Sequence, residues 1–219
     1  MAWWNDGIVQ GGALGCGPVL VWALALYVAS RAPSRRASML AALAMLCLAA
    51  YLTGEALGAL APDLPTWSGW LRRTWLAPSL AAPAWLILTL ALAADEGPEP
   101  LSSQIRRLLL PVAIVAFLVG GGLGVVGMLT TSLQDWNTPF IVDPPDGAGH
   151  GTRHVPRGPL LAAYQVFVLV CLVWAAINLV LLWRTSPHGS PLRARFAWLT
   201  ATALIFLTFG AWSFRWRVE

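Results

Sequence analysis

The stretch from Leu108 to Leu129, which reads LLLPVAIVAFLVGGGLGVVGML, contains no charged residue and no strongly polar side chain. A helix of about 20 apolar residues is long enough to cross a hydrocarbon core of about 30 Å. A strand of a transmembrane β-barrel would instead need about ten residues of alternating polarity. The stretch therefore predicts a membrane-spanning α-helix.

Similar apolar runs recur along the chain, separated by charged or Pro/Gly-rich segments. The 219 residues are 58% hydrophobic and only 11% charged, with a mean hydropathy of +0.66, whereas soluble domains carry about 25% charged residues. We expect spans at about 9–29, 37–60, 72–94, 108–129, 160–183 and 196–214, with an external loop at 130–159. The sequence thus predicts an all-α, polytopic transmembrane bundle of about six spans, forming a single domain over residues 1–219.

The arginines indicate how this bundle is oriented. Short loops at 31–36 and 184–195 each carry three arginines and no acid, and Arg106 and Arg107 follow the third span. The positive-inside rule places these loops in the cytoplasm. The N-terminus and the 130–159 loop are then outside the inner membrane of the cell. Six arginines fall on the outer side in this arrangement: Arg72, Arg73, Arg153, Arg157, Arg215 and Arg217.

The formal charge of +4 excludes several functions because the sequence contains no lysine. A retinal or pyridoxal Schiff base and a Walker phosphate loop each need a lysine amine. We attribute the basic charge to membrane topology and expect no nucleic-acid partner. Cys16, Cys47 and Cys171 are far apart in apolar stretches, which indicates no disulfide framework. No cofactor is expected.

Glu55 stands near the end of the second expected span, where a carboxylate is costly unless it reaches the interface, is paired or faces a cavity. Arg72 and Arg73 are natural partners across the next turn. A salt bridge between the two spans is the ordinary interpretation, and a ligand-binding carboxylate is the alternative. Trp85 lies deeper, where it could line an apolar pocket or simply pack in the core. We take Glu55, Arg72, Arg73 and Trp85 as candidate ligand-binding residues.

Four residues within the spans predict helix packing. Gly120 and Gly124 form a GxxxG pair, which lets another helix approach closely. Gln165 and Asn178 can hydrogen-bond across the bundle. We interpret all four as contacts between helices.

The polar loop contains a weak metal-site pattern. His150 and His154 have an i, i+4 spacing and follow Asp143 and Asp146, so a helical turn would aim both imidazoles at one zinc or copper ion. The neighbouring glycines disfavour a helix, and nothing fixes a third ligand. A flexible solvated loop is the alternative.

Several segments share a pattern with one family of membrane regions. They are the basic loop Arg31–Arg36, the end of the second span at Tyr51–Leu57, Trp70–Arg73, Pro78 and Pro83–Leu86 in the third span, Tyr164, and Arg193–Leu199. In these features the chain resembles the N-terminal seven-transmembrane sensor region of bacterial and archaeal histidine kinases. Such a region needs a seventh helix to bring its C-terminus inside, and the six spans counted here leave that last helix absent.

The resemblance implies a membrane-embedded sensory input region in a two-component system. Its partners would be the lipid bilayer, a second copy or other membrane chains, and a small-molecule or lipid ligand. No phosphoacceptor-histidine helix or ATP site is recognised in a polar segment, so we expect the chain to be no enzyme by itself. The alternative is a non-catalytic membrane subunit of a larger complex. A small transporter is a weaker hypothesis, because it predicts a repeat symmetry that the sequence lacks.

Overall fold

The computed structural model describes residues 19–20, 23–24, 36–97, 99, 101–142, 152–191 and 193–201. Most of the expected first and sixth spans therefore lies outside the described residues, although residues 193–201 are helical. The elements are α2 (Arg36–Ala59), α3 (Leu64–Thr74), α4 (Leu76–Glu96), α5 (Leu101–Leu129), β1 (Phe140–Val142), β2 (Thr152–His154) and α6 (Leu161–Thr185).

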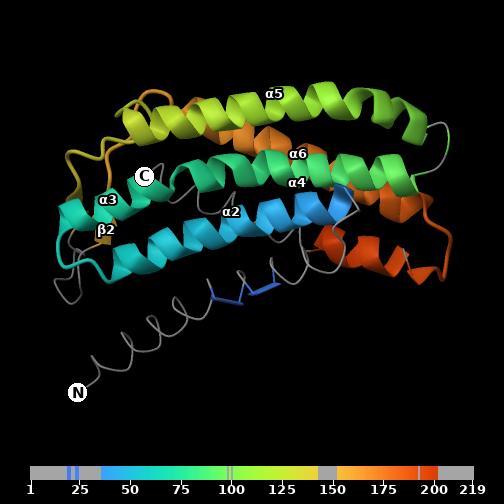
Figure 1. Ribbon diagram of the computed structural model, residues 1–219, viewed down its shortest axis with the longest axis horizontal. Coiled ribbons are helices and arrows are strands. Elements are labelled where there is room, and N and C mark those ends of the chain that lie inside the picture. The colour runs from blue at the N-terminus through green and yellow to red at the C-terminus, as the bar shows by residue number, and fades with distance from the viewer. Residues whose placement is uncertain are drawn as a thin grey trace, which may run out of the picture.

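Helices α2, α4, α5 and α6 run side by side (Figure 1). Four segments in the described part of the chain are long and apolar enough to cross a membrane: Ser38–Ala59, Leu64–Glu96, Ser102–Leu129 and Leu161–Thr185. The prediction of an all-α transmembrane bundle is confirmed. We call the end that carries α3 and the two strands the hairpin end, and the end where α4 joins α5 the short-loop end.

Helix α3 occupies most of the stretch between the expected spans 37–60 and 72–94. Asp63 caps it, because its Oδ1 accepts a hydrogen bond from the backbone N–H of Thr66 at 2.7 Å. Pro65 in the first turn costs no helix hydrogen bond. These two residues start a helix ahead of the expected third span, and Trp75 links it to α4.

The expected external loop contains a short antiparallel hairpin. Phe140 pairs with His154, Ile141 with Arg153, and Val142 with Thr152. Gln134 forms an isolated bridge with Arg157. Three-residue strands carry little periodicity, so no sequence pattern indicates strands here.

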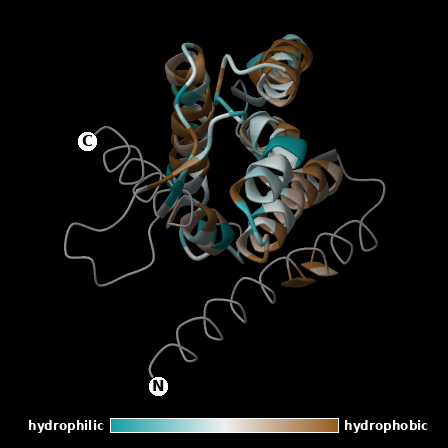
Figure 2. Cartoon of the chain, turned by 90° about the vertical axis from the view of Figure 1, so that its left-hand side faces the viewer, coloured by the Kyte–Doolittle hydropathy of each residue, from teal (hydrophilic) through white to brown (hydrophobic). Residues whose placement is uncertain are grey.

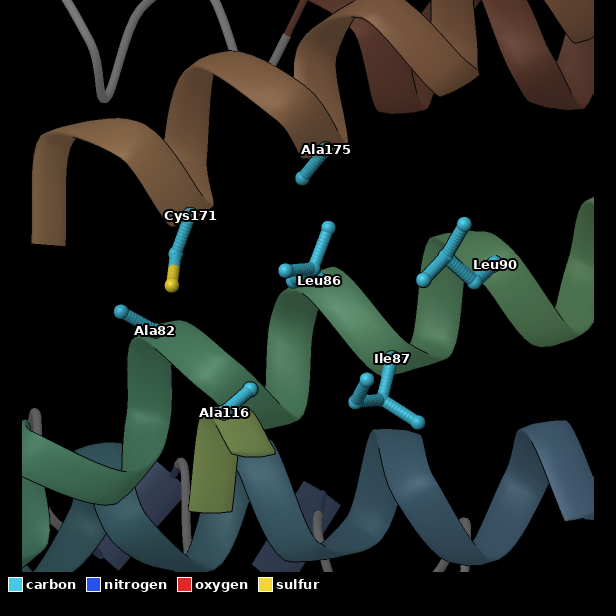
Figure 3. Packing of buried hydrophobic residues seen from close by; sticks show 7 residues of the cluster. All are labelled: Ala82, Leu86, Ile87, Leu90, Ala116, Cys171 and Ala175. Atoms are coloured by element: carbon cyan, nitrogen blue, oxygen red, sulfur yellow. The ribbon is translucent and has the colours of Figure 1, made fainter. Parts of the chain in front are cut away.

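Helix α4 is the centre of the bundle. Its residues Ala82, Leu86, Ile87 and Leu90 form the main core cluster with Ala116 of α5 and with Cys171 and Ala175 of α6. Figure 3 shows Leu86 directed toward α6 and Ile87 directed toward α2. A helix that is covered on several sides in this way connects both ends of the bundle through packed side chains.

The outer helices present apolar side chains away from the protein. Leu118 of α5 is 69% exposed, and Val166 of α6 is 61% exposed. Viewed from the hairpin end, the ribbons of the long helices are coloured largely brown and white, and the hydrophilic teal is confined to short stretches (Figure 2). Such surfaces match a lipid environment, where they need no protein cover.

Candidate functional site

An aromatic cluster closes the hairpin end of the bundle. Trp75, at the junction of α3 and α4, lies 5.4 Å from both Trp136 and Tyr164 between ring centroids. Trp136 is buried, and its Nε1 donates to the Gly127 carbonyl at 2.7 Å. The cluster therefore joins α3, α4, α5, α6 and the segment after α5.

Arginine side chains from other segments cap two helix C-termini at this end. Arg72 donates through Nε to the Met128 carbonyl and through Nη2 to the Leu129 carbonyl at 3.4 Å, which caps α5. Arg153 of β2 donates through Nη1 to the Gly58 carbonyl in the last turn of α2 at 3.5 Å, and through Nη2 to the Ala61 carbonyl just past that helix at 3.2 Å. The last carbonyls of a helix have no partner within it and carry partial negative charge. Capping gives these two arginines a structural role at the hairpin end.

At the short-loop end, arginine side chains also cap helix C-termini. Arg106 donates through Nε to the Ala94 carbonyl of α4 at 3.0 Å. Arg193 donates through Nη1 to the carbonyl of Ser186, the C-cap of α6, at 3.4 Å. In the described part of the chain, α2, α4, α5 and α6 thus each have a guanidinium from another segment at or just past the C-terminal end.

Glu55 is half-buried on α2. Within the described part of the chain it forms no ion pair with Arg72 or Arg73, since Arg72 caps α5 and the Arg73 guanidinium lies 5.4 Å from the Trp70 ring centroid. The expected salt bridge across the turn is replaced by these contacts. The structure therefore does not bring the three candidate residues together.

Gly120 and Gly124 lie against α4. A Cβ at Gly120 would lie 2.6 Å from the Ser79 carbonyl oxygen, and one at Gly124 would lie 2.6 Å from Leu76 Cδ1. The Ser79 carbonyl lacks its usual helix donor because Pro83, four residues later, has no N–H. Glycine lets α5 cover this carbonyl closely.

Asn178 is buried at the interface of α4 and α6, where its Nδ2 donates to Thr89 Oγ1 at 3.2 Å. The Thr89 hydroxyl in turn donates to the Leu86 carbonyl at 2.8 Å. Gln165 is half-buried on α6, six residues before Cys171 of the main core. Trp85 is also half-buried and packs against that core.

The metal-site candidates are only partly placed. His154 belongs to β2 and stacks on Phe140, with 5.7 Å between ring centroids, while Asp143, Asp146 and His150 lie outside the described residues. Where the chain is described, no three His, Cys, Asp or Glu side chains are grouped as metal ligands would be.

A half-open groove of about 340 Å³ lies at the hairpin end, between α3 and the segment that follows α5. It is lined by Pro65, Ser68, Gly69, Arg72, Trp136, Asn137 and Pro139. Of the candidate ligand-binding residues, only Arg72 lines it. The groove forms where segments about 70 residues apart meet, which no local sequence pattern could indicate.

The electrostatics near the groove are simple. The Thr66 backbone N–H, helped by the Thr66 hydroxyl, lowers the pKa of Asp63 because it stabilises the carboxylate. Asp135 accepts hydrogen bonds from the Asn137 N–H at 3.1 Å and from the Thr138 hydroxyl at 2.7 Å. Both carboxylates are therefore engaged in local turns.

Comparison with known proteins places the chain in one family. No curated protein and no solved structure matches it. The sequence pattern described as the N-terminal 7TM region of histidine kinase matches residues 14–216, nearly the whole chain. This confirms the resemblance drawn from the sequence, and with it a multi-pass membrane location. The chain belongs to the family of N-terminal seven-transmembrane regions of histidine kinases.

Proposed function

We propose that this region is the membrane-embedded input part of a histidine-kinase signalling system, with the hairpin end outside the inner membrane. An event at the hairpin end would move α4 and be read at the short-loop end. The observation that carries this proposal is the position of Trp75, which belongs to the aromatic cluster and directly precedes α4. Signal transfer requires an element with two arrangements that both ends can bias.

Helix α4 suits that role because of its interior. Pro83 leaves the Ser79 carbonyl without a helix donor, so the helix can bend there without breaking a main-chain bond. The same carbonyl faces Gly120 of α5. A change in bend at Pro83 would therefore alter how α4 packs on α5 and displace the short-loop end.

Coupling between the two ends can be tested without knowing a ligand. Nitroxide labels on cysteines at exposed Gln104 and Arg195 would report distances at the short-loop end, in nanodiscs and with the three native cysteines replaced by alanine. Trp136→Phe removes the hydrogen bond to Gly127, and we expect it to shift the distance distribution measured by pulsed electron resonance.

The matched control is Phe140→Leu, which alters an exposed aromatic residue of β1 at the same end. We expect it to leave the distribution unchanged. Identical distributions in Trp136→Phe and the parent would contradict the proposed coupling. Equal shifts in both variants would indicate general loosening of the hairpin end and would also contradict it.

A further inference from the structure

Hydrogen bonds of Ser68 and Trp136 hold the base of the groove at the hairpin end. Ser68 is 2% exposed, and its hydroxyl lies within hydrogen-bond distance of the Pro65 carbonyl at 3.2 Å and the Trp136 carbonyl at 3.3 Å. Trp136 is itself held by Gly127. These contacts tie α3 to the segment after α5, so the groove exists before any ligand arrives.

Arg72 brings a permanent positive charge to this groove. A guanidinium has five N–H donors, and the bonds to Met128 and Leu129 use its Nε and one Nη2 position. Three donors remain. The end of α5 carries only about half a negative charge, so a net positive charge is left at the groove wall.

No carboxylate in the described part of the chain neutralises that charge. Asp63 caps α3 and Asp135 closes its own turn. Arg73, which could compete for an anion, is directed to the Trp70 ring. Arg72 is therefore the cation that a ligand in the groove would meet.

The remaining walls are largely apolar. Pro65, Trp136 and Pro139 line the groove, and Gly69 leaves open space above α3, because a Cβ there would meet no atom within 4 Å. The volume of about 340 Å³ lies at the lower end of the range for small-molecule sites. It suits a small charged head with part of an apolar chain.

We propose that the groove binds an anionic amphiphile, whose carboxylate or phosphate group meets Arg72 and whose apolar part lies against Pro65, Trp136 and Pro139. Arg72 lies against the C-terminal end of the α5 candidate span, and the ends of membrane spans lie close to the headgroup region. A lipid headgroup and a free amphiphile both carry this chemistry. This site would give the proposed input region its class of ligand. Binding in the groove does not depend on the proposed function, but the signalling effect of binding does.

Photo-crosslinking of the full chain in phosphatidylcholine nanodiscs tests the site. The probe is decanoate that carries a diazirine, and the labelled residues are mapped by mass spectrometry. We expect labelling at 65–72 and 136–139. Unlabelled decanoate and decyl phosphate should compete, whereas decyltrimethylammonium and decanol, with the same chain, should not.

Two substitutions and a control define the expected loss. Gly69→Leu fills the groove from a position with free space, and Arg72→Gln removes the charge; each should reduce labelling by at least about tenfold. Gly122→Leu makes the same change on α5, where a Cβ also meets nothing within 4 Å, and should label normally. Because Gly69→Leu leaves the α5 cap intact, it stays informative if Arg72→Gln folds poorly.

Nanodiscs that contain phosphatidylglycerol separate the two ligand sources. Suppressed labelling there assigns the site to an anionic lipid headgroup, and unchanged labelling assigns it to a free amphiphile. Equal competition by the cation and the alcohol, or full labelling of Gly69→Leu, would overturn the proposal. The label-distance experiment contains no ligand, so failure of this site and failure of the proposed coupling are distinguishable.

Discussion

Helices α4 and α5 pack against each other and are both strongly apolar, but they have opposite surroundings. Within Leu64–Glu96, the spanning segment that contains α4, 61% of the residues in the most apolar 18-residue window are buried in the protein. In the corresponding window of Ser102–Leu129, which belongs to α5, only 17% are buried. Leu86 of α4 is 2% exposed, whereas Leu118 of α5 is 69% exposed.

The contrast teaches that hydrophobicity does not separate inside from outside in this bundle. Lipid is as apolar as leucine, so small and hydroxyl-bearing residues mark contacts between helices. On α4, Ser79 and Thr89 are fully buried. On α5, the side that meets α4 is formed by Gly120, Gly124 and Ala116.

The largest effect that would sharpen this contrast is loss of a core side chain. Leu86→Ala should destabilise the chain by about 2–5 kcal/mol, because it leaves a cavity between α4 and α6. Leu118→Ala makes the same change where lipid can fill the space, and its cost should be far smaller. Unfolding in mixed micelles of dodecyl maltoside and SDS, followed by circular dichroism, measures both. If both substitutions lower the free energy of unfolding equally, the difference in burial between α4 and α5 does not affect stability.

The next effect concerns the cap that connects α3 to the end of α5. Arg72→Gln should cost about 1.5–3 kcal/mol, the range for hydrogen bonds to charged groups, because the Met128 and Leu129 carbonyls lose their donor. Arg73→Gln is the matched control and should cost about 1 kcal/mol or less, since the exposed Arg73 guanidinium lies over the Trp70 ring. The same unfolding measurement compares them. A larger loss in Arg73→Gln would contradict the capping role.

The glycine face of α5 offers a steric test of the contrast. Gly124→Leu should destabilise by about 1–3 kcal/mol through overpacking, because its Cβ would lie 2.6 Å from Leu76 Cδ1 and 3.0 Å from Ser79 Cβ. Gly122→Leu, directed to open space, should be neutral. Thermal melting of the two purified variants is sufficient to rank them. Similar melting temperatures would mean that α5 does not pack on α4 through this face.

A smaller effect is expected at the polar contact between α4 and α6. The hydrogen bond from Asn178 to Thr89 should be worth about 0.6 kcal/mol, the average for such bonds in membranes. A double-mutant cycle with Asn178→Leu and Thr89→Val isolates this coupling. A coupling energy of zero would show that this hydrogen bond does not stabilise the packing of α4 against α6.

The smallest effect is a pH dependence at the start of α3. The folded-state pKa of Asp63 lies below its unfolded value, so its stabilising contribution is present above the unfolded pKa and is lost as pH falls through the folded pKa. We expect the melting temperature of the wild type to fall with pH in this window, in part because this contribution is lost. Asp63→Asn keeps a good cap and should melt with less pH dependence over that window. An unchanged acid profile would exclude Asp63 as the source.

The sequence predicted those parts of the molecule that depend on local length and composition. The run at 108–129 indicated the helix that became α5, and Gly120, Gly124 and Asn178 were identified as packing residues that the structure places between helices. These features follow from one helix at a time. They need no knowledge of which helix is the neighbour.

What the sequence did not predict depends on distant segments meeting. Arg72 was expected to pair with Glu55 across a turn, but the end of α5, more than 50 residues away, receives it. Trp136 and Ser68 were not identified at all, because neither belongs to a local pattern. The groove that they form arises only from tertiary packing.

The arginine caps have a consequence for how the bundle fits its membrane. Helix α5 has 29 residues, about 43 Å at 1.5 Å per residue, which exceeds a hydrocarbon core of about 30 Å. Helix ends that depend on water must stay at the surface, but ends whose carbonyls bond to guanidinium groups can enter the headgroup layer without that cost. The bundle can therefore meet bilayers of different thickness by tilting or sinking, while these carbonyls keep their arginine donors.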